Sequence, residues 1–177
     1  MSTFAPAIAR LSAALLGLSL AVSAHAAEPS SGPPAPGQII ALPLNPVVPA
    51  SLRTCSAKTP SGLGYSLLRP SDGPKPASSD MVLVNYIGYL AADGQAFDQA
   101  TGAVFEAGAV IPGFSEGLML LPKGGVIRLC VPAALGYDAQ GTGPIPANAA
   151  LVFQVELLDF RNAAEVRAAQ AEQEGQR

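Results

Sequence analysis

Few side chains in this sequence can act as nucleophiles, general bases or metal ligands. The one histidine, His25, lies in a segment that we interpret below as a removable leader. The two cysteines, Cys55 and Cys130, stand far apart and form no CxxC pair. A mature chain without histidine can have no Ser–His–Asp or Cys–His catalysis and no histidine metal site. The sequence therefore predicts neither a metal nor a cofactor.

Charge and glycine patterns exclude two further classes of function. The chain of 177 residues carries 10 basic and 13 acidic side chains, a net charge of −3, and the basic ones are scattered. This distribution is not typical of nucleic-acid binding. Gly141-Thr142-Gly143 lies between turns and does not join a strand to a helix, so it does not indicate a phosphate-binding loop. The length suits one domain with appendages.

The N-terminal residues have the pattern of a secretory signal peptide. Arg10 precedes the apolar residues 11–22, and Ala24-His25-Ala26 supplies the small-x-small pattern that signal peptidase accepts. We expect residues 1–26 to be cleaved off, which places the mature protein in the periplasm or outside the cell. The alternative is an uncleaved anchor, but the apolar run is shorter than the roughly 20 residues that span a bilayer. We expect no stable membrane insertion after cleavage.

The elements that would position functional side chains begin after a proline-rich segment. Residues 27–58, the first part of which is dense in proline, are predicted to form an extended tether because proline blocks helix formation. From about Ser61 onward, short apolar runs alternate with Gly, Pro and Asp turns, which is typical of β structure. We expect strands at residues 62–69, 80–90, 126–131 and 150–160, and a broken return strand in two halves at 95–98 and 104–106.

One short helix is predicted at residues 112–121, because Pro112 stands near its start and three apolar side chains share one face. These side chains are Phe114, Leu118 and Leu121. In the last strand, apolar and polar residues alternate, which predicts one buried face and one solvated face that carries Gln154 and Glu156.

These elements together predict an α+β domain over residues 59–160. Its fold would be an antiparallel β-sheet of about five strands with one short α-helix packed on it. The short polar tail, residues 161–177, permits a helix but has little to bury, so we expect it to fray.

Four segments of the sequence occur in a fixed order. They are VNYIGYLAADGQAFD (84–98), VIPGFSEGL (110–118), LGYDAQGTGPIPANA (135–149) and LVFQVELLDF (151–160). Together they resemble the FKBP-type peptidyl-prolyl cis-trans isomerases of the exported bacterial type, over roughly residues 62–160. The resemblance implies a half-open antiparallel sheet wrapped around the short helix, with a hydrophobic pocket between the two.

The resemblance also implies a set of site residues. The catalytic positions would be Tyr86, Asp98, Ile111 and Tyr137. The Ile111 amide and the Tyr137 hydroxyl would donate to substrate carbonyls, and Asp98 would orient Tyr86 or polarise the rim. The substrate-binding positions would be Phe97, Phe105, Val110, Phe114, Ile145 and Phe153, with Phe114 as the floor. Taken singly, each aromatic residue on a strand is more often a core residue than part of a site.

The activity that the resemblance implies is isomerisation of X–Pro bonds during the folding of exported proteins. The partners would be proline-containing polypeptides and macrolide inhibitors. The proline-rich tether favours a monomer. Four positions depart from the family pattern: Phe114 where tryptophan is common, Ala103 at a wall position, Asp138 after the loop tyrosine, and Ala147 in place of a second proline. The alternative function is a catalytically weak proline-binding module or chaperone-like scaffold.

The resemblance implies a disulfide as well. Cys55 precedes the first strand and Cys130 lies near the end of the strand at 126–131, and in the family these strands are antiparallel neighbours. In an oxidising compartment we therefore expect a Cys55–Cys130 bond. The alternative is two unrelated thiols.

Overall fold

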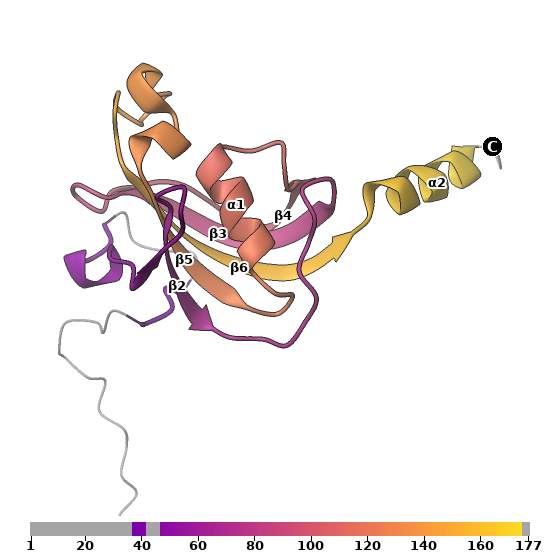
Figure 1. Cartoon of the computed structure of the whole chain (residues 1–177). Coiled ribbons are helices and arrows are strands. Elements are labelled where there is room, and N and C mark those ends of the chain that lie inside the picture. Colours follow the sequence, from indigo (N-terminus) through magenta and orange to yellow (C-terminus); the bar gives the residue numbers. More distant parts are fainter. Residues whose placement is uncertain (1–36, 42–46, 175–177) are drawn as a thin grey trace, which may run out of the picture. The chain divides into compact units, whose positions relative to one another are not determined.

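The computed structural model describes residues 37–41 and 47–174, so the predicted leader lies outside the described residues. Within the described part, six strands form one antiparallel sheet in the order β1-β2-β5-β6-β3-β4 (Figure 1). The strands are β1 Ala57–Lys58, β2 Gly64–Arg69, β3 Met81–Leu90, β4 Ala96–Glu106, β5 Val126–Val131 and β6 Leu151–Arg161. The helices are α1 Pro112–Leu120 and α2 Ala163–Glu174, with 3₁₀ turns at Ala50–Leu52, Ala133–Leu135 and Asp138–Gln140. The predicted α+β class is confirmed.

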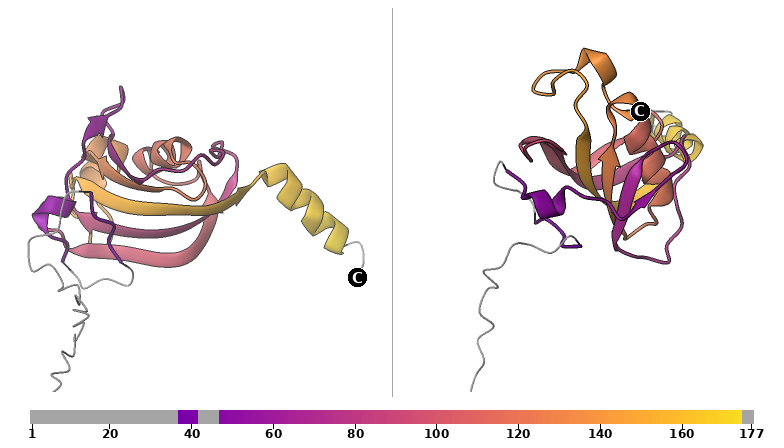
Figure 2. Two further views of the ribbon diagram at one scale, coloured as in Figure 1. Left: turned by 90° about the horizontal axis from the view of Figure 1, so that it is seen from below. Right: turned by 60° about the vertical axis from the view of Figure 1, so that its left-hand side comes forward.

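Helix α1 lies across one face of the curved sheet, as Figures 1 and 2 show. Two of its glycines permit this close approach. A Cβ atom on Gly117 would lie 2.2 Å from a methyl of Leu129, and one on Gly113 would lie 2.6 Å from a methyl of Val131. The helix backbone therefore packs directly on the side chains of Leu129 and Val131 of β5 at these points.

Strand β3 is buried on both faces, which confirms its predicted central position between β6 and β4. Side chains alternate along a strand, so even-numbered residues such as Val82 and Val84 join the core beneath α1. The odd-numbered Ile87 and Tyr89 join a second buried cluster. This second cluster lies on the opposite face.

The second cluster is completed by the N-terminal segment, by which we mean residues 37–41 and 47–58. Its side chains Ile40, Val48 and Leu52 are buried against Ile87, Tyr89 and Val152. The backbone amide and carbonyl of Ile40 pair with the side-chain amide of Gln154 at 2.6 and 2.8 Å. The described part of the predicted tether is thus packed on the domain, and Gln154, expected on a solvated face, is only 6% exposed.

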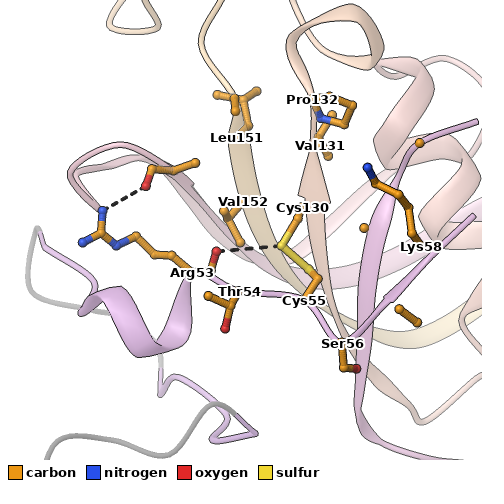
Figure 3. A pocket seen from close by; sticks show the side chains of 15 residues that line it. Arg53, Thr54, Cys55, Ser56, Lys58, Cys130, Val131, Pro132, Leu151 and Val152 are labelled. Carbon is orange, nitrogen blue, oxygen red and sulfur yellow. Dashed lines mark hydrogen bonds between the residues drawn. A yellow bond between two sulfur atoms is a disulfide. The ribbon is translucent and has the colours of Figure 1, made fainter.

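Cys55 and Cys130 are joined by a disulfide, as expected, which ties the N-terminal segment to β5 (Figure 3). Gly64 of the adjacent strand β2 makes room for it. A Cβ atom on Gly64 would lie 2.9 Å from the Cβ of Cys130 and 3.2 Å from that of Cys55.

Two further elements differ from the sequence prediction. The expected two halves of the return strand form one strand, β4, because irregularities in its pairing with β3 absorb the turn-like residues in its middle. Gly102 has a positive φ of 66°, and its amide donates to the side chain of Asn85 at 2.9 Å. The tail forms helix α2, although we expected it to fray. At the start of α2, the side-chain oxygen of Asn162 accepts a hydrogen bond from the Ala164 amide.

Candidate functional site

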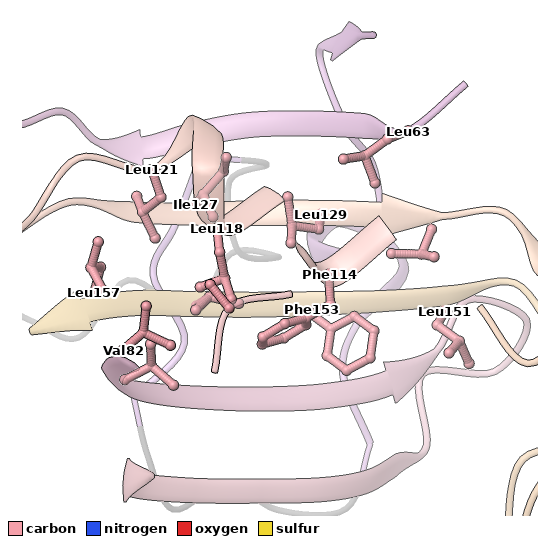
Figure 4. Close-up of a cluster of buried hydrophobic side chains, with 14 of the residues drawn as sticks. Leu63, Val82, Phe114, Leu118, Leu121, Ile127, Leu129, Leu151, Phe153 and Leu157 are labelled. Carbon is pink, nitrogen blue, oxygen red and sulfur yellow. The ribbon is translucent and has the colours of Figure 1, made fainter. Parts of the chain in front are cut away.

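Phe114 lies at the centre of a cluster of aromatic rings between α1 and the sheet. Its ring centroid is 4.9 Å from that of Phe153, 5.8 Å from Phe105 and 6.0 Å from Tyr86. Phe97 extends the cluster through Phe153, at 5.7 Å. Most of these pairs meet edge to face, the arrangement that aromatic quadrupoles favour. Figure 4 shows Phe114 of α1 and Phe153 of β6 side by side above the strands.

Gly88 on β3 allows two of these rings to meet. It pairs with Asp98 on β4 and with Phe153 on β6. A Cβ atom at position 88 would lie 2.6 Å from the ring of Phe97 and 2.7 Å from the ring of Phe153. Our sequence analysis did not single out Gly88, although a glycine inside a strand often marks such a close approach.

A hydrogen-bonded pair, Tyr86 and Asp98, borders the ring cluster. The Tyr86 hydroxyl donates to Oδ2 of Asp98 at 2.6 Å. Burial, followed by this hydrogen bond, raises the pKa of Tyr86 well above its usual value, and the charge of Asp98 and the nearby Tyr137 act in the same direction. Tyr86 therefore stays protonated at neutral pH. Its hydroxyl proton points to a carboxylate that is exposed to solvent.

The segments before and after β5 bring in the other predicted positions. Val110 and Ile111 are half-buried against the core just before α1, and the Ile111 carbonyl accepts from the amides of Phe114 and Ser115 at 3.0 Å. Tyr137 is 37% exposed, and it lies close enough to Tyr86 to influence its pKa. Ile145 is buried in the core beneath α1, and its backbone pairs with that of Thr142.

The structure thus brings together all ten side chains that the resemblance implied. Eight belong to one core or pack against it: Tyr86, Phe97, Phe105, Val110, Ile111, Phe114, Ile145 and Phe153. Asp98 is joined to this group by its hydrogen bond with Tyr86, and the exposed Tyr137 lies near enough to raise the pKa of Tyr86. Ala103 also packs partly buried against this core, where a larger residue would narrow the site. The arrangement offers an apolar aromatic floor with hydroxyl and carboxylate groups at one side.

This fold and site define the class of the protein. A family model described as FKBP-type peptidyl-prolyl cis-trans isomerase matches residues 73–158. The crystal structure of a peptidyl-prolyl cis-trans isomerase from Pseudomonas syringae has a TM-score of 0.56 and 36% identity, and the match covers 59% of this chain and 79% of that one. The crystal structure of FkpA from Escherichia coli has a TM-score of 0.58 and 40% identity. That match covers 60% of this chain and 52% of the FkpA chain.

The chain belongs to the FKBP-type peptidyl-prolyl cis-trans isomerases. Among curated proteins, it is 44% identical over 104 residues to FkpA of Aeromonas hydrophila, an FKBP-type peptidyl-prolyl cis-trans isomerase; the match covers 56% of this chain. It spans only 38% of that relative's length.

In the part of the chain that the structure describes, no helix is both long and apolar enough to cross a membrane.

Proposed function

We propose that this protein accelerates the cis–trans isomerisation of X–Pro peptide bonds in the aromatic site centred on Phe114. The observation that carries the proposal is the Tyr86–Asp98 hydrogen bond at the border of an otherwise apolar ring cluster. A prolyl ring is apolar and suits such a floor, and the adjoining amide needs polar partners at its edge. The site offers both within one surface.

The chemistry needs no covalent step. Rotation about a peptide bond has a barrier of about 18–20 kcal/mol because resonance gives the C–N bond partial double-bond character. Resonance also places negative charge on the carbonyl oxygen, which water stabilises. Aromatic walls around the prolyl amide withdraw that water and favour the twisted, less polar amide. A surface that fits the twisted form better than either planar form lowers the barrier in both directions equally.

Each polar residue then has a separate task. The Ile111 amide, at the start of α1, and the Tyr137 hydroxyl would hold the carbonyl groups that flank the proline, fixing the substrate while its amide rotates. Asp98 would act as a positioning residue, because its carboxylate accepts a hydrogen bond from the Tyr86 hydroxyl. This bond would hold the Tyr86 ring in place, with its centroid 6.0 Å from that of Phe114. Phe97, Phe105 and Phe153 would enclose the prolyl ring.

We further propose that the mature protein acts as a monomer on polypeptides that fold after export, in the periplasm or outside the cell. Two observations support export: the signal-peptide pattern of residues 1–26 and the Cys55–Cys130 disulfide, which persists in oxidising compartments. Macrolide inhibitors would compete for the same aromatic site.

A protease-coupled isomerisation assay on Ala-Leu-Pro-Phe and Ala-Glu-Pro-Phe peptides tests the proposal. We expect the wild-type protein to accelerate exchange, and Asp98→Ala and Tyr137→Phe to be slower by about tenfold, as loss of one hydrogen bond predicts. Asp72→Ala and Tyr65→Phe are matched controls, since neither residue is among the ten proposed site residues, and both variants should retain full activity. A folded wild-type protein that binds such peptides but leaves their exchange at the background rate would instead be a proline-binding module.

A further inference from the structure

An open cleft of about 610 Å³ lies beside the disulfide, away from the ring cluster around Phe114. One wall is formed by residues 53–58 of the N-terminal segment, and the other by the adjoining ends of β5 and β6. None of the ten proposed site residues is among the described residues that line it. Its volume falls within the range of about 300–1,000 Å³ that is usual for ligand-binding clefts.

The charge of this cleft differs from that of the protein. The whole chain has a net charge of −3, yet the only charged side chains among the described lining residues are Arg53 and Lys58. Arg53 is half-buried, and one guanidinium nitrogen donates to the Ala91 carbonyl at 2.9 Å, which fixes the group at the cleft wall. Lys58 is exposed on β1. The cleft therefore attracts anionic groups.

The spacing of the two cations indicates the shape of the ligand. Arg53 and Lys58 lie on either side of the disulfide in Figure 3. The five residues of chain from Arg53 to Lys58 place the two Cα atoms at most about 17 Å apart. In an extended peptide, side chains four residues apart lie on the same face and about 13 Å from each other. Two such carboxylates match the two cations, since both side chains are long.

The apolar part of the lining completes the match. Val131, Pro132 and Leu151 lie above the disulfide in Figure 3, on the sheet side of the cleft. Val131 and Leu151 are buried, but the half-buried Pro132 and the exposed Ala150 can contact apolar side chains of a bound segment between its acidic ones. We propose that this cleft is a second polypeptide-binding site, which takes an extended acidic segment that need not contain proline. A polypeptide held here would present its nearby prolines to the proposed isomerase site at a raised effective concentration.

The direct test is a titration of the ¹⁵N-labelled protein with a proline-free peptide of about ten residues, with two glutamates four residues apart among valines and leucines. We expect amide shifts in residues 53–58 and at Cys130 and Val152, with those around Phe114 unchanged. The same peptide with lysines for glutamates should bind more weakly. Because the probe lacks proline, this result is independent of isomerase activity.

Variants at two lysines separate a specific site from general attraction. Lys58→Glu should weaken binding by about five- to tenfold, and Lys58→Gln by less, as expected for loss of one partly exposed ionic contact. Lys75→Glu changes the net charge equally at an exposed position outside the cleft and should leave binding unchanged. Equal weakening by Lys58→Glu and Lys75→Glu, or saturation without shifts at the cleft, overturns the proposal. Unchanged amide spectra of the free variants establish that both are folded.

Discussion

The two faces of the sheet are covered in different ways. On one face, α1 contributes the apolar side chains of Phe114 and Leu118 to a core of apolar residues. On the other face, the N-terminal segment buries Ile40 and Leu52 beside polar side chains of the sheet. Gln154 pairs with the Ile40 backbone there, the Tyr89 hydroxyl donates to the Leu52 carbonyl at 2.7 Å, and Arg128 donates to the Gln38 carbonyl at 2.9 Å.

The difference follows from backbone hydrogen bonding. A helix satisfies most of its own N–H and C=O groups, so the surface beneath it can be wholly apolar. An extended segment cannot do so, and each buried backbone group must find a partner outside the segment. The packing on the α1 face is therefore determined by shape complementarity, since glycines allow the helix to approach β5 and the aromatic rings to approach β3. A few buried polar side chains specify the N-terminal face.

The largest expected effect comes from removing the bond that attaches the N-terminal segment. The double variant Cys55→Ala/Cys130→Ala loses the restriction on a loop of sequence separation 75, which corresponds to about 4.5 kcal/mol of unfolding free energy in the chain-entropy model. Denaturant unfolding of the variant and of the wild type measures the loss. Reduced wild type should match the variant. A difference below about 1 kcal/mol would mean that the bond contributes little to stability.

Gly88→Ala tests the dependence of the α1 face on shape. The added methyl would overlap the rings of Phe97 and Phe153, so we expect a loss of about 1–3 kcal/mol and a marked fall in isomerase rate. Unfolding and the protease-coupled assay measure the two effects. Gly37→Ala, where no atom lies within 4 Å of the added carbon, is the control. Wild-type activity in Gly88→Ala would contradict the proposed enclosure of the prolyl ring by Phe97 and Phe153.

Gln154→Ala tests the polar character of the N-terminal face. It leaves the buried amide and carbonyl of Ile40 without their side-chain partner, at an expected cost of about 1–2 kcal/mol. Chemical denaturation gives the stability, and the isomerase assay should show no change because the side chain lies on the opposite face. Gln140→Ala, at an exposed position, should be neutral. Equal stabilities for the two variants would argue that water replaces Gln154 without cost.

The smallest expected effect concerns the loop that carries Tyr137. Asp138 has a φ of 47°, a left-handed conformation that side chains disfavour. Asp138→Gly should therefore stabilise the protein by about 0.5 kcal/mol, because relief of strain exceeds the added entropy of the unfolded chain. Thermal unfolding measures it. Asp72→Gly, at an exposed position without a positive φ, should instead be neutral or destabilising.

The α1 face could be predicted from the sequence because its residues lie in short segments with strong local signals. Pro112 and the spacing of Phe114, Leu118 and Leu121 indicate the helix, and the four family-like segments contain nine of the ten proposed site residues. The tenth, Phe105, lies in β4, whose continuity was not predicted. Thr101 and Gly102 look like a turn, but they lie in the strand between Ala100 and Ala103, which both pair with β3, and the Gly102 amide donates to Asn85.

The N-terminal face could not be predicted in the same way. Proline density predicts an extended tether, but it does not indicate that Ile40, Val48 and Leu52 are buried. The sheet residues that bind this segment, Gln154 and Arg128, also lack a local sequence pattern that would predict their burial. Gln154 follows the alternation of a solvated face, and Arg128 is fully buried although arginine is usually exposed. Burial of these residues depends on contacts between segments about 90 to 114 positions apart.

Strand β3 supplies side chains to both faces, Tyr86 to one and Ile87 to the other. An insertion or deletion of one residue within it would exchange the two sets, because the side-chain period of a strand is two. The Tyr86 hydroxyl would then point into the packing of the N-terminal segment, and Ile87 would replace it beside Asp98. The two faces can therefore diverge in evolution by substitution, each on its own, whereas a one-residue change in the length of β3 alters both together wherever no bulge absorbs it.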